Sequence, residues 1–277
     1  MKIQYEDDGL IIFESDLFRT CSSLIKASDH IIIVDPNWLP REVNTIFEQA
    51  QKYGENKEKY LLFTHSDYDH IIGYNKFKNY KTIGSANFVS NPNKEAILNQ
   101  IKEFDDEYYI TRDYQIRYPV LDIVIAEDNF ELEIGTDKYI FYQSLGHNSD
   151  GIITYNKSKG MLIAGDYLSN IEFPYVYDSF ENYKNTLAKF TKIIENEDVK
   201  ILITGHGDYT KDKAEMQLRI KESYDYIYQL KSALLKQTDF DLDKLFTRYE
   251  FPIGMAKFHA KNIEVLQKEM QNKNRKT

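Results

Sequence analysis

The apolar residues of the first half fall into short runs separated by turn residues, together with two segments of helical spacing. Asp8-Gly9 is a hairpin-turn dipeptide between two such runs. Pro40 suits the first turn of a helix, and Gly54 suits its end. The pattern predicts strands at 3–5, 10–13, 21–26, 30–35 and 60–64. It predicts a helix from 40 to 53, and a second helix that Asn91-Pro92 opens, with Ile97, Ile101 and Phe104 on one face.

The second half repeats this alternation. We expect strands at 121–126, 130–134, 138–143, 151–155, 161–165 and 200–204, and a helix that Ser179 caps. Apolar stripes in the tail predict helices at 211–236 and 254–271. No Pro/Gly/Ser-rich linker interrupts the chain. Two strand-rich halves with interleaved helices predict an α/β (α+β) fold of two sheets packed face to face with helices outside.

Composition and charge indicate a folded protein and disfavour several classes of partner and site. The 277 residues are 42% apolar and 14% aromatic, which is enough for a packed core. The net charge is −9; the last 67 residues carry 14 Lys/Arg and 10 Asp/Glu, or +4, so the first 210 carry −13. An acidic body disfavours nucleic acid as a partner. One cysteine, Cys21, excludes a disulfide framework and a cysteine-based zinc site.

Polar residues with metal-binding side chains follow the apolar runs directly. His65 and His70 come after one run, His147 and His206 after two others, and Asp166 after a fourth. The ends of strands are where catalytic side chains of α/β scaffolds gather. The densest cluster, His65-Ser66-Asp67-Tyr68-Asp69-His70, holds four candidate ligands in six residues. In an extended loop, residues 65, 67 and 69 share one side, and a turn after Asp69 would bring His70 to a second metal.

These motifs resemble those of the metallo-β-lactamase superfamily over about Asp35 to Asp208. Thr64–His70 matches the family's T-H-x-H-x-D-H loop with one departure. Gly146-His147, Gly165-Asp166 and Gly205-His206-Gly207 match the later motifs in order, and Asp35 matches the early Asp that supports the metal loop. The resemblance implies a four-layer αββα sandwich of two mixed sheets. It predicts a metallo-β-lactamase domain at 1–210 and a C-terminal helical extension at 211–277 packed on it.

The resemblance also implies a binuclear metal site. One metal would be bound by His65, Asp67 and His147, and the other by Asp69, His70 and His206, with Asp166 bridging the two. A hydroxide between the two divalent ions would be the nucleophile, and Asp69 would handle the proton as the catalytic residue.

Asp67 is the departure, because the family usually has His there. A carboxylate adds a harder ligand and negative charge, which shifts metal preference toward Fe or Mn. We expect two divalent ions, zinc first and iron or manganese as the alternatives. The flavodiiron branch of the superfamily has Glu at this position.

Several nearby residues have two interpretations. Asp150 either supports His147 or caps a turn with Gly151. Phe173, Tyr175 and Tyr177 form an aromatic substrate wall or pack between a loop and a sheet. His259 lies at the flank of the last stripe, and an ordinary surface contact is favoured over a place at the mouth of the site. We expect His30 to be exposed and Cys21 to be a small core residue.

The leading hypothesis is a metal-dependent hydrolase acting on a small ester, thioester, lactone or related substrate. The helical tail is similar to that of glyoxalase II and lactonase-like members. The alternatives are a non-haem di-iron oxidoreductase, a phosphoester or nucleic-acid hydrolase, and a binding protein with a degenerate site. We expect a small-molecule partner and a cytoplasmic location, since no run reaches the ~20 apolar residues of a membrane span. A homodimer stays open.

Overall fold

A computed structural model describes residues 1–274 and divides the chain into two compact units. Unit 1 comprises residues 1–143 and 150–159. Unit 2 comprises residues 144–149 and 160–277, and the structure describes its residues up to 274. The units do not test the predicted domain boundary after residue 210, which stays a prediction.

Unit 1 contains a seven-stranded mixed sheet, in the order β1 to β7. Its first four strands form antiparallel pairs, and β4, β5, β6 and β7 pair in parallel. The strands are β1 Lys2–Glu6, β2 Leu10–Glu14, β3 Cys21–Lys26, β4 His30–Val34, β5 Glu58–Leu62, β6 Lys81–Ser85 and β7 Ile123–Ile125. The predicted hairpin at Asp8-Gly9 is therefore confirmed.

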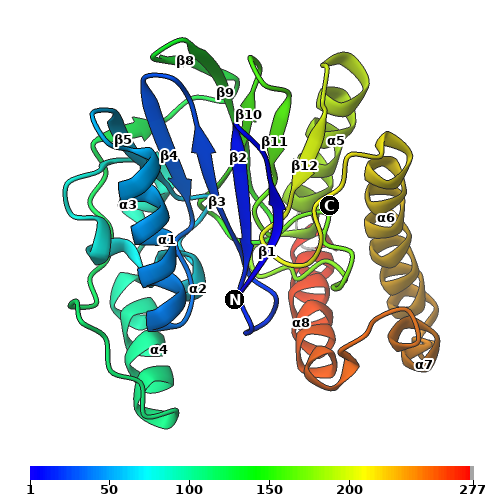
Figure 1. Cartoon of the computed structure of the whole chain (residues 1–277). Coiled ribbons are helices and arrows are strands. Elements are labelled where there is room, and N and C mark those ends of the chain that lie inside the picture. The colour runs from blue at the N-terminus through cyan, green and yellow to red at the C-terminus, as the bar shows by residue number, and fades with distance from the viewer. Residues whose placement is uncertain (275–277) are drawn as a thin grey trace. The chain divides into compact units, whose positions relative to one another are not determined.

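The helices of unit 1 lie on this sheet through their apolar faces. Helix α1 packs against β3 and β4 (Figure 1), and α3 packs against β6 and β7. The fully buried Trp38 stacks on Phe104 of α4, with ring centroids 4.6 Å apart. The helices are α1 Pro40–Tyr53, α2 Tyr68–Ile71, α3 Ala86–Ser90 and α4 Lys94–Glu107, and a 3-10 helix, η1, spans Tyr74–Phe77. The short α2, α3 and η1 were not predicted.

The second sheet is also mixed. Its strands in unit 1 are β8 Phe130–Ile134, β9 Asp137–Ser144 (of which Ser144 belongs to unit 2) and β10 Gly151–Asn156. Strands β8 and β9 are antiparallel, and β10 contacts β6 of the first sheet. Strands β11 Met161–Ile163 and β12 Ile201–Ile203 belong to unit 2 and are parallel. The predicted α/β class with two mixed sheets is confirmed.

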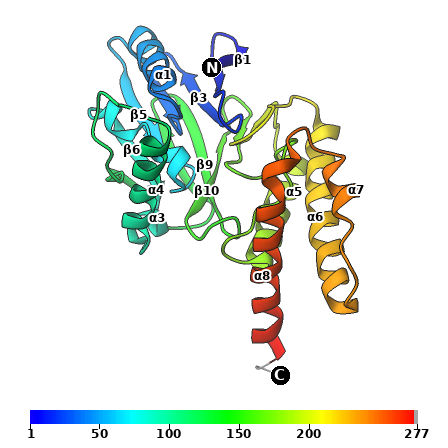
Figure 2. The same cartoon turned by 90° about the horizontal axis from the view of Figure 1, so that it is seen from below.

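Unit 2 is completed by helices that pack on one another. Helix α5 contacts α6 and α8, and α6 also contacts α8 (Figure 2). Ser179 caps α5 as predicted, accepting a hydrogen bond from the amide of Asn182. The helices are α5 Phe180–Asn196, α6 Lys213–Lys236, α7 Leu242–Phe246 and α8 Met255–Asn274, and a 3-10 helix, η2, spans Pro252–Gly254. None of the helices described is long and apolar enough to cross a membrane.

Two expectations about buried residues are settled here. Cys21 is a buried core residue, as predicted. His30 is not exposed, because it begins the buried strand β4, where its ring packs edge-on to Tyr60 and Tyr139. Its Nδ1 lies 2.7 Å from Asp29, and its Nε2 lies 3.2 Å from the Tyr139 hydroxyl. These partners satisfy both ring nitrogens, which the sequence did not indicate.

Candidate metal centre

The donors of unit 1 lie where two parallel strands end. Val34 of β4 pairs with Leu62 of β5, so the chain leaves both strands at the same edge. Asp35 follows β4, and its amide still donates to the Leu62 carbonyl at 3.0 Å. Thr64 and His65 follow β5. The register therefore brings the early Asp beside the start of the metal loop.

Asp35 organises this loop through a buried hydrogen-bond network. Its Oδ1 accepts the Thr64 amide at 2.9 Å, and its Oδ2 accepts the Thr64 hydroxyl at 2.5 Å. The same Oδ2 lies 3.0 Å from Nδ1 of His70, and the Thr64 hydroxyl oxygen lies 3.0 Å from Nδ1 of His65. Since the Thr64 proton goes to Asp35, both histidines donate from Nδ1. This tautomer leaves Nε2 as the atom that can bind a metal.

The donor atoms have the spacing of ligands that share an ion. Nε2 of His65 lies 3.5 Å from Oδ2 of Asp67, and Nε2 of His70 lies 3.5 Å from Oδ2 of Asp69. Two ligand atoms ~2.0–2.1 Å from one zinc in tetrahedral geometry are about 3.4 Å apart. The Asp67 carboxylate thus fits a coordination position that a histidine usually holds. The expectation of an extended loop through Asp69 is wrong, because α2 begins at Tyr68.

Ser66, between His65 and Asp67, is fixed by Asp150. The Asp150 carboxylate accepts the Ser66 amide at 3.2 Å and the Ser66 hydroxyl at 2.5 Å. The side-chain amide of Asn91 donates to both residues. Asp150 therefore supports the metal loop, a contact that neither of its two sequence interpretations included.

The donors of unit 2 also follow a pair of parallel strands. Ile163 of β11 pairs with Ile203 of β12, and Asp166 and His206 each come three residues later. Oδ2 of Asp166 lies 3.3 Å from Nε2 of His206. Gly205 makes this approach possible, since a Cβ there would lie 2.0 Å from Oδ1 of Asp166.

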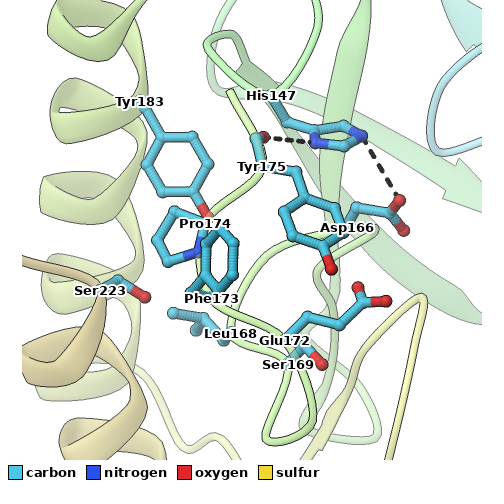
Figure 3. Close-up of a pocket in the computed structure, with 10 residues that line it drawn as sticks. All are labelled: His147, Asp166, Leu168, Ser169, Glu172, Phe173, Pro174, Tyr175, Tyr183 and Ser223. Atoms are coloured by element: carbon cyan, nitrogen blue, oxygen red, sulfur yellow. Dashed lines mark hydrogen bonds and ion pairs between the residues drawn. The ribbon is translucent and has the colours of Figure 1, made fainter. Parts of the chain in front are cut away.

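His147 completes the unit 2 set. Its Nε2 lies 3.3 Å from Oδ2 of Asp166, and its Nδ1 lies 2.7 Å from the Tyr175 carbonyl (Figure 3). Because a carbonyl only accepts, Nδ1 carries the proton and Nε2 faces the carboxylate with its lone pair. The His147 amide donates to the Tyr167 hydroxyl at 2.9 Å, and the His147 carbonyl accepts the Tyr177 amide at 2.8 Å. Both the ring and the backbone of His147 are therefore held in place.

Gly146 is required beside this histidine, and Gly146→Ala is predicted to destabilise the protein by about 2 kcal/mol. Its φ is +122°, and a Cβ would lie 2.2 Å from the backbone nitrogen of Tyr183. Urea unfolding measures the loss. Gly254→Ala is the control, because a Cβ at Gly254 meets nothing within 4 Å. Equal stability of the two variants would contradict the prediction.

A small cavity of about 10 Å³ lies beside His147 and Asp166 in unit 2, with room for about one water molecule. Phe173, Tyr175 and Glu172 contribute to its lining (Figure 3). Burial, and next the charge of Glu172, raise the pKa of the Tyr175 hydroxyl, so it is a neutral donor.

The three aromatic residues of the candidate substrate wall and His259 occupy different environments. Phe173 and Tyr175 line the cavity, whereas Tyr177 is 40% exposed, with its ring centroid 5.2 Å from that of His147. His259 is 3% exposed, so the surface contact favoured for it is wrong. It packs against Phe173 and Phe240, behind the cavity lining. Burial lowers its pKa and favours the neutral ring. A substrate-binding role for these four residues stays a prediction.

Sequence reasoning missed Thr64 and Asn91 as supports of the metal loop. Thr64 offered a signal, since a hydroxyl at the end of a buried strand and directly before a candidate ligand needs a hydrogen-bond partner. Asn91 offered no sequence signal. Its contacts with Ser66 and Asp150 join three segments that are separate in the sequence.

Comparison with known proteins identifies the family. A search of curated proteins finds no match. Solved structures share the fold: a sec-alkylsulfatase from a Pseudomonas species (TM-score 0.64, 12% identity, 83% of this chain) and a metallo-β-lactamase family protein from Thermus thermophilus (TM-score 0.62, 15% identity, 94% of both chains). A metallo-β-lactamase from Pontibacter korlensis matches with TM-score 0.57 and 11% identity over 81% of this chain and 99% of its own. The chain spans 43% of the alkylsulfatase.

The family model of the metallo-β-lactamase superfamily matches residues 16–206. This range includes all seven candidate metal ligands, which lie at 65, 67, 69, 70, 147, 166 and 206. The chain therefore belongs to the metallo-β-lactamase superfamily.

Proposed function

We propose that this protein is a zinc-dependent hydrolase with a binuclear metal centre. His65, Asp67 and His147 would hold one ion, and Asp69, His70 and His206 the other. Asp166 would bridge them. The ligand assignment follows the family motifs, and the alternatives of iron and manganese come from Asp67.

The observation that supports a metal centre most is the shared geometry of the donor pairs. Each candidate histidine has Nε2 at 3.3–3.5 Å from a carboxylate oxygen. Three of the four have Nδ1 beside an acceptor, in Thr64, Asp35 and Tyr175. Asp69 is buried and Asp67 and Asp166 are partly buried, and carboxylates so placed beside neutral imidazoles are costly without a positive charge between them. A divalent cation supplies that charge.

We propose separate roles in hydrolysis for the protein's own residues. Divalent ions, when bound, supply an activated water and polarise the scissile carbonyl. Asp69, with its side chain about 10% exposed, is the carboxylate we propose to take the proton released on attack. Asp35 and Tyr175 hold the histidine rings so that Nε2 need not reorient during turnover.

The substrate we propose is a small ester, thioester, lactone or related molecule. The net charge of −9 disfavours a polyanionic nucleic acid. The relatives include an alkylsulfatase and metallo-β-lactamases, so the screen should include a sulfate ester and a β-lactam. We propose a cytoplasmic location. The oligomeric state is a separate question, for which a homodimer is the alternative to a monomer.

Metal analysis tests this proposal. Protein purified without added metal should contain about two zinc ions per chain by plasma mass spectrometry. Dialysis against a chelator should lower hydrolysis of the best substrate about 10³-fold, and zinc should restore it. The Asp67→His variant, which has the usual family ligand, is the matched comparison and should retain two zinc ions.

Other metal contents would give different answers. Iron with an optical or redox signal would replace the hydrolase with the di-iron oxidoreductase, which the carboxylate of Asp67 favours. A single ion that becomes two in Asp67→His would mean that Asp67 leaves its site empty. Absence of metal from both proteins would contradict the proposal.

A further inference from the structure

Helix α8 sends one buried polar side chain to the segment that follows Asp166. Asn262 is 1% exposed. Its Oδ1 accepts the Val176 amide at 2.9 Å, and its Nδ2 donates to the Pro174 carbonyl at 2.6 Å. The side chain thus binds the backbone on both sides of Tyr175.

The contact with Val176 acts on the same peptide group that orients His147. The Tyr175 carbonyl and the Val176 amide belong to one planar unit, with the oxygen and the N–H on opposite edges. Asn262 holds the N–H edge, and the carbonyl edge lies 2.7 Å from Nδ1 of His147. Any rotation of this peptide plane would break both hydrogen bonds together.

The orientation of the Asn262 amide follows from its partners. The Val176 amide can only donate and the Pro174 carbonyl can only accept, so oxygen and nitrogen cannot exchange places. The second Nδ2 proton goes to the Tyr226 hydroxyl at 2.8 Å, and that hydroxyl lies 3.1 Å from Nδ1 of His259. A neutral His259 accepts the Tyr226 proton, and every polar atom of the Asn262 side chain has a partner.

Aromatic packing fixes the same segment to the C-terminal helices. Tyr175 stacks on Phe258 of α8 with ring centroids 4.1 Å apart, and Phe173 stacks on Tyr226 of α6 at 4.7 Å. Stacked aromatic pairs of this kind stabilise the packing of the segment on the helices. The rings hold the segment in place, and among the contacts described Asn262 is the one that holds the N–H edge of the Tyr175–Val176 peptide plane.

We propose that Asn262 is a positioning residue that fixes the His147 imidazole, through the Tyr175–Val176 peptide group, with Nδ1 protonated and Nε2 directed at Asp166. The inference rests on the proposed function in so far as His147 is a metal ligand. Under this proposal, helix α8 contributes to the candidate metal site by orienting His147.

Ring-nitrogen NMR of the metal-free protein tests this directly. At about pH 8.5, where an ordinary histidine is neutral, wild-type His147 should show the Nδ1–H tautomer. Asn262→Ala should give a mixture of the two tautomers, because the peptide plane is released. The His147→Gln spectrum assigns the signals.

Leu266→Ala is the control for a general loss of helix packing. Leu266 lies one turn further along α8 and is 4% exposed, but it makes no contact with the Tyr175–Val176 peptide among the hydrogen bonds and ring pairs described. It should destabilise α8 and leave the tautomer unchanged. If Asn262→Ala does not fold, Asn262→Leu replaces it, since leucine keeps the volume and removes the hydrogen bonds.

A zinc titration by calorimetry adds a second readout and separates the two proposals. Asn262→Ala should bind zinc about 10-fold more weakly than Leu266→Ala, as is typical when the partner that orients a ligand is lost. Wild-type protein that binds no zinc would overturn the proposed function, while the tautomers would still decide the role of Asn262. The same tautomer in Asn262→Ala as in Leu266→Ala would overturn the inference.

Discussion

The Asp166→Asn enzyme is expected to lose about 10³-fold in kcat/KM for the substrate that the wild type hydrolyses. Asp166 is the unit 2 carboxylate whose Oδ2 lies 3.3 Å from Nε2 of both His147 and His206. Asparagine keeps the shape of the side chain and removes its negative charge. Of the candidate ligands in unit 2, Asp166 alone is anionic, so its loss removes the charge that offsets a divalent ion.

The measurement combines steady-state kinetics with metal content per chain. We expect Asp166→Asn to lose at least part of its zinc and to be rescued poorly by added metal. Asp225→Asn is the matched control, because Asp225 pairs with Lys221 on the surface of α6 at 2.5 Å and should leave kinetics and metal unchanged. Near-normal kcat/KM in Asp166→Asn would contradict a bridging role.

Most secondary structure was predictable because local signals agree with the tertiary structure. The segment from Pro40 to Gly54 has a helix-starting proline, an apolar face and a glycine at its end, and it forms α1. The tail stripes became α6 and α8 for the same reason. The short α2 and α3 have too few residues for a periodic pattern, and they form where the chain turns between other elements.

The candidate ligands were predictable because each follows a strand. Strand β4 pairs in parallel with β5, and β11 pairs in parallel with β12. Residues that directly follow the two strands of each pair therefore lie at the same edge of the sheet. The supporting contacts were harder to predict. His30 and His259 are buried beside Tyr139 and Tyr226, partners that lie 109 and 33 residues away in the sequence.

Asn262 gave a weak signal that sequence reasoning did not use. It lies three residues after His259 and four before Leu266, which places a side-chain amide on the buried stripe of α8. A polar residue on such a stripe needs partners. The sequence could indicate that partners exist, but not that they would be the backbone on either side of Tyr175.

Asp35→Ala is expected to lower the free energy of unfolding by about 4 kcal/mol, because it removes a buried charged partner. The carboxylate is 2% exposed and accepts hydrogen bonds from the Thr64 amide, the Thr64 hydroxyl and His70. Asp35 also has a φ of +45°, a conformation that alanine tolerates less well than Asp or Asn.

Asp35→Ala should also reduce metal binding, which separates this residue from an ordinary stabilising carboxylate. Without Asp35, His70 and, through Thr64, His65 lose the acceptor that keeps Nδ1 protonated. Asp122→Ala is the control, since Asp122 is an exposed carboxylate that also accepts the amide and hydroxyl of a threonine, Thr82, but lies outside the metal loop. Urea unfolding and zinc content should be measured on both variants. Asp122→Ala should lose stability and keep its zinc. If Asp35→Ala also keeps full zinc content, the histidine tautomers of the loop do not depend on Asp35, and the network serves folding alone.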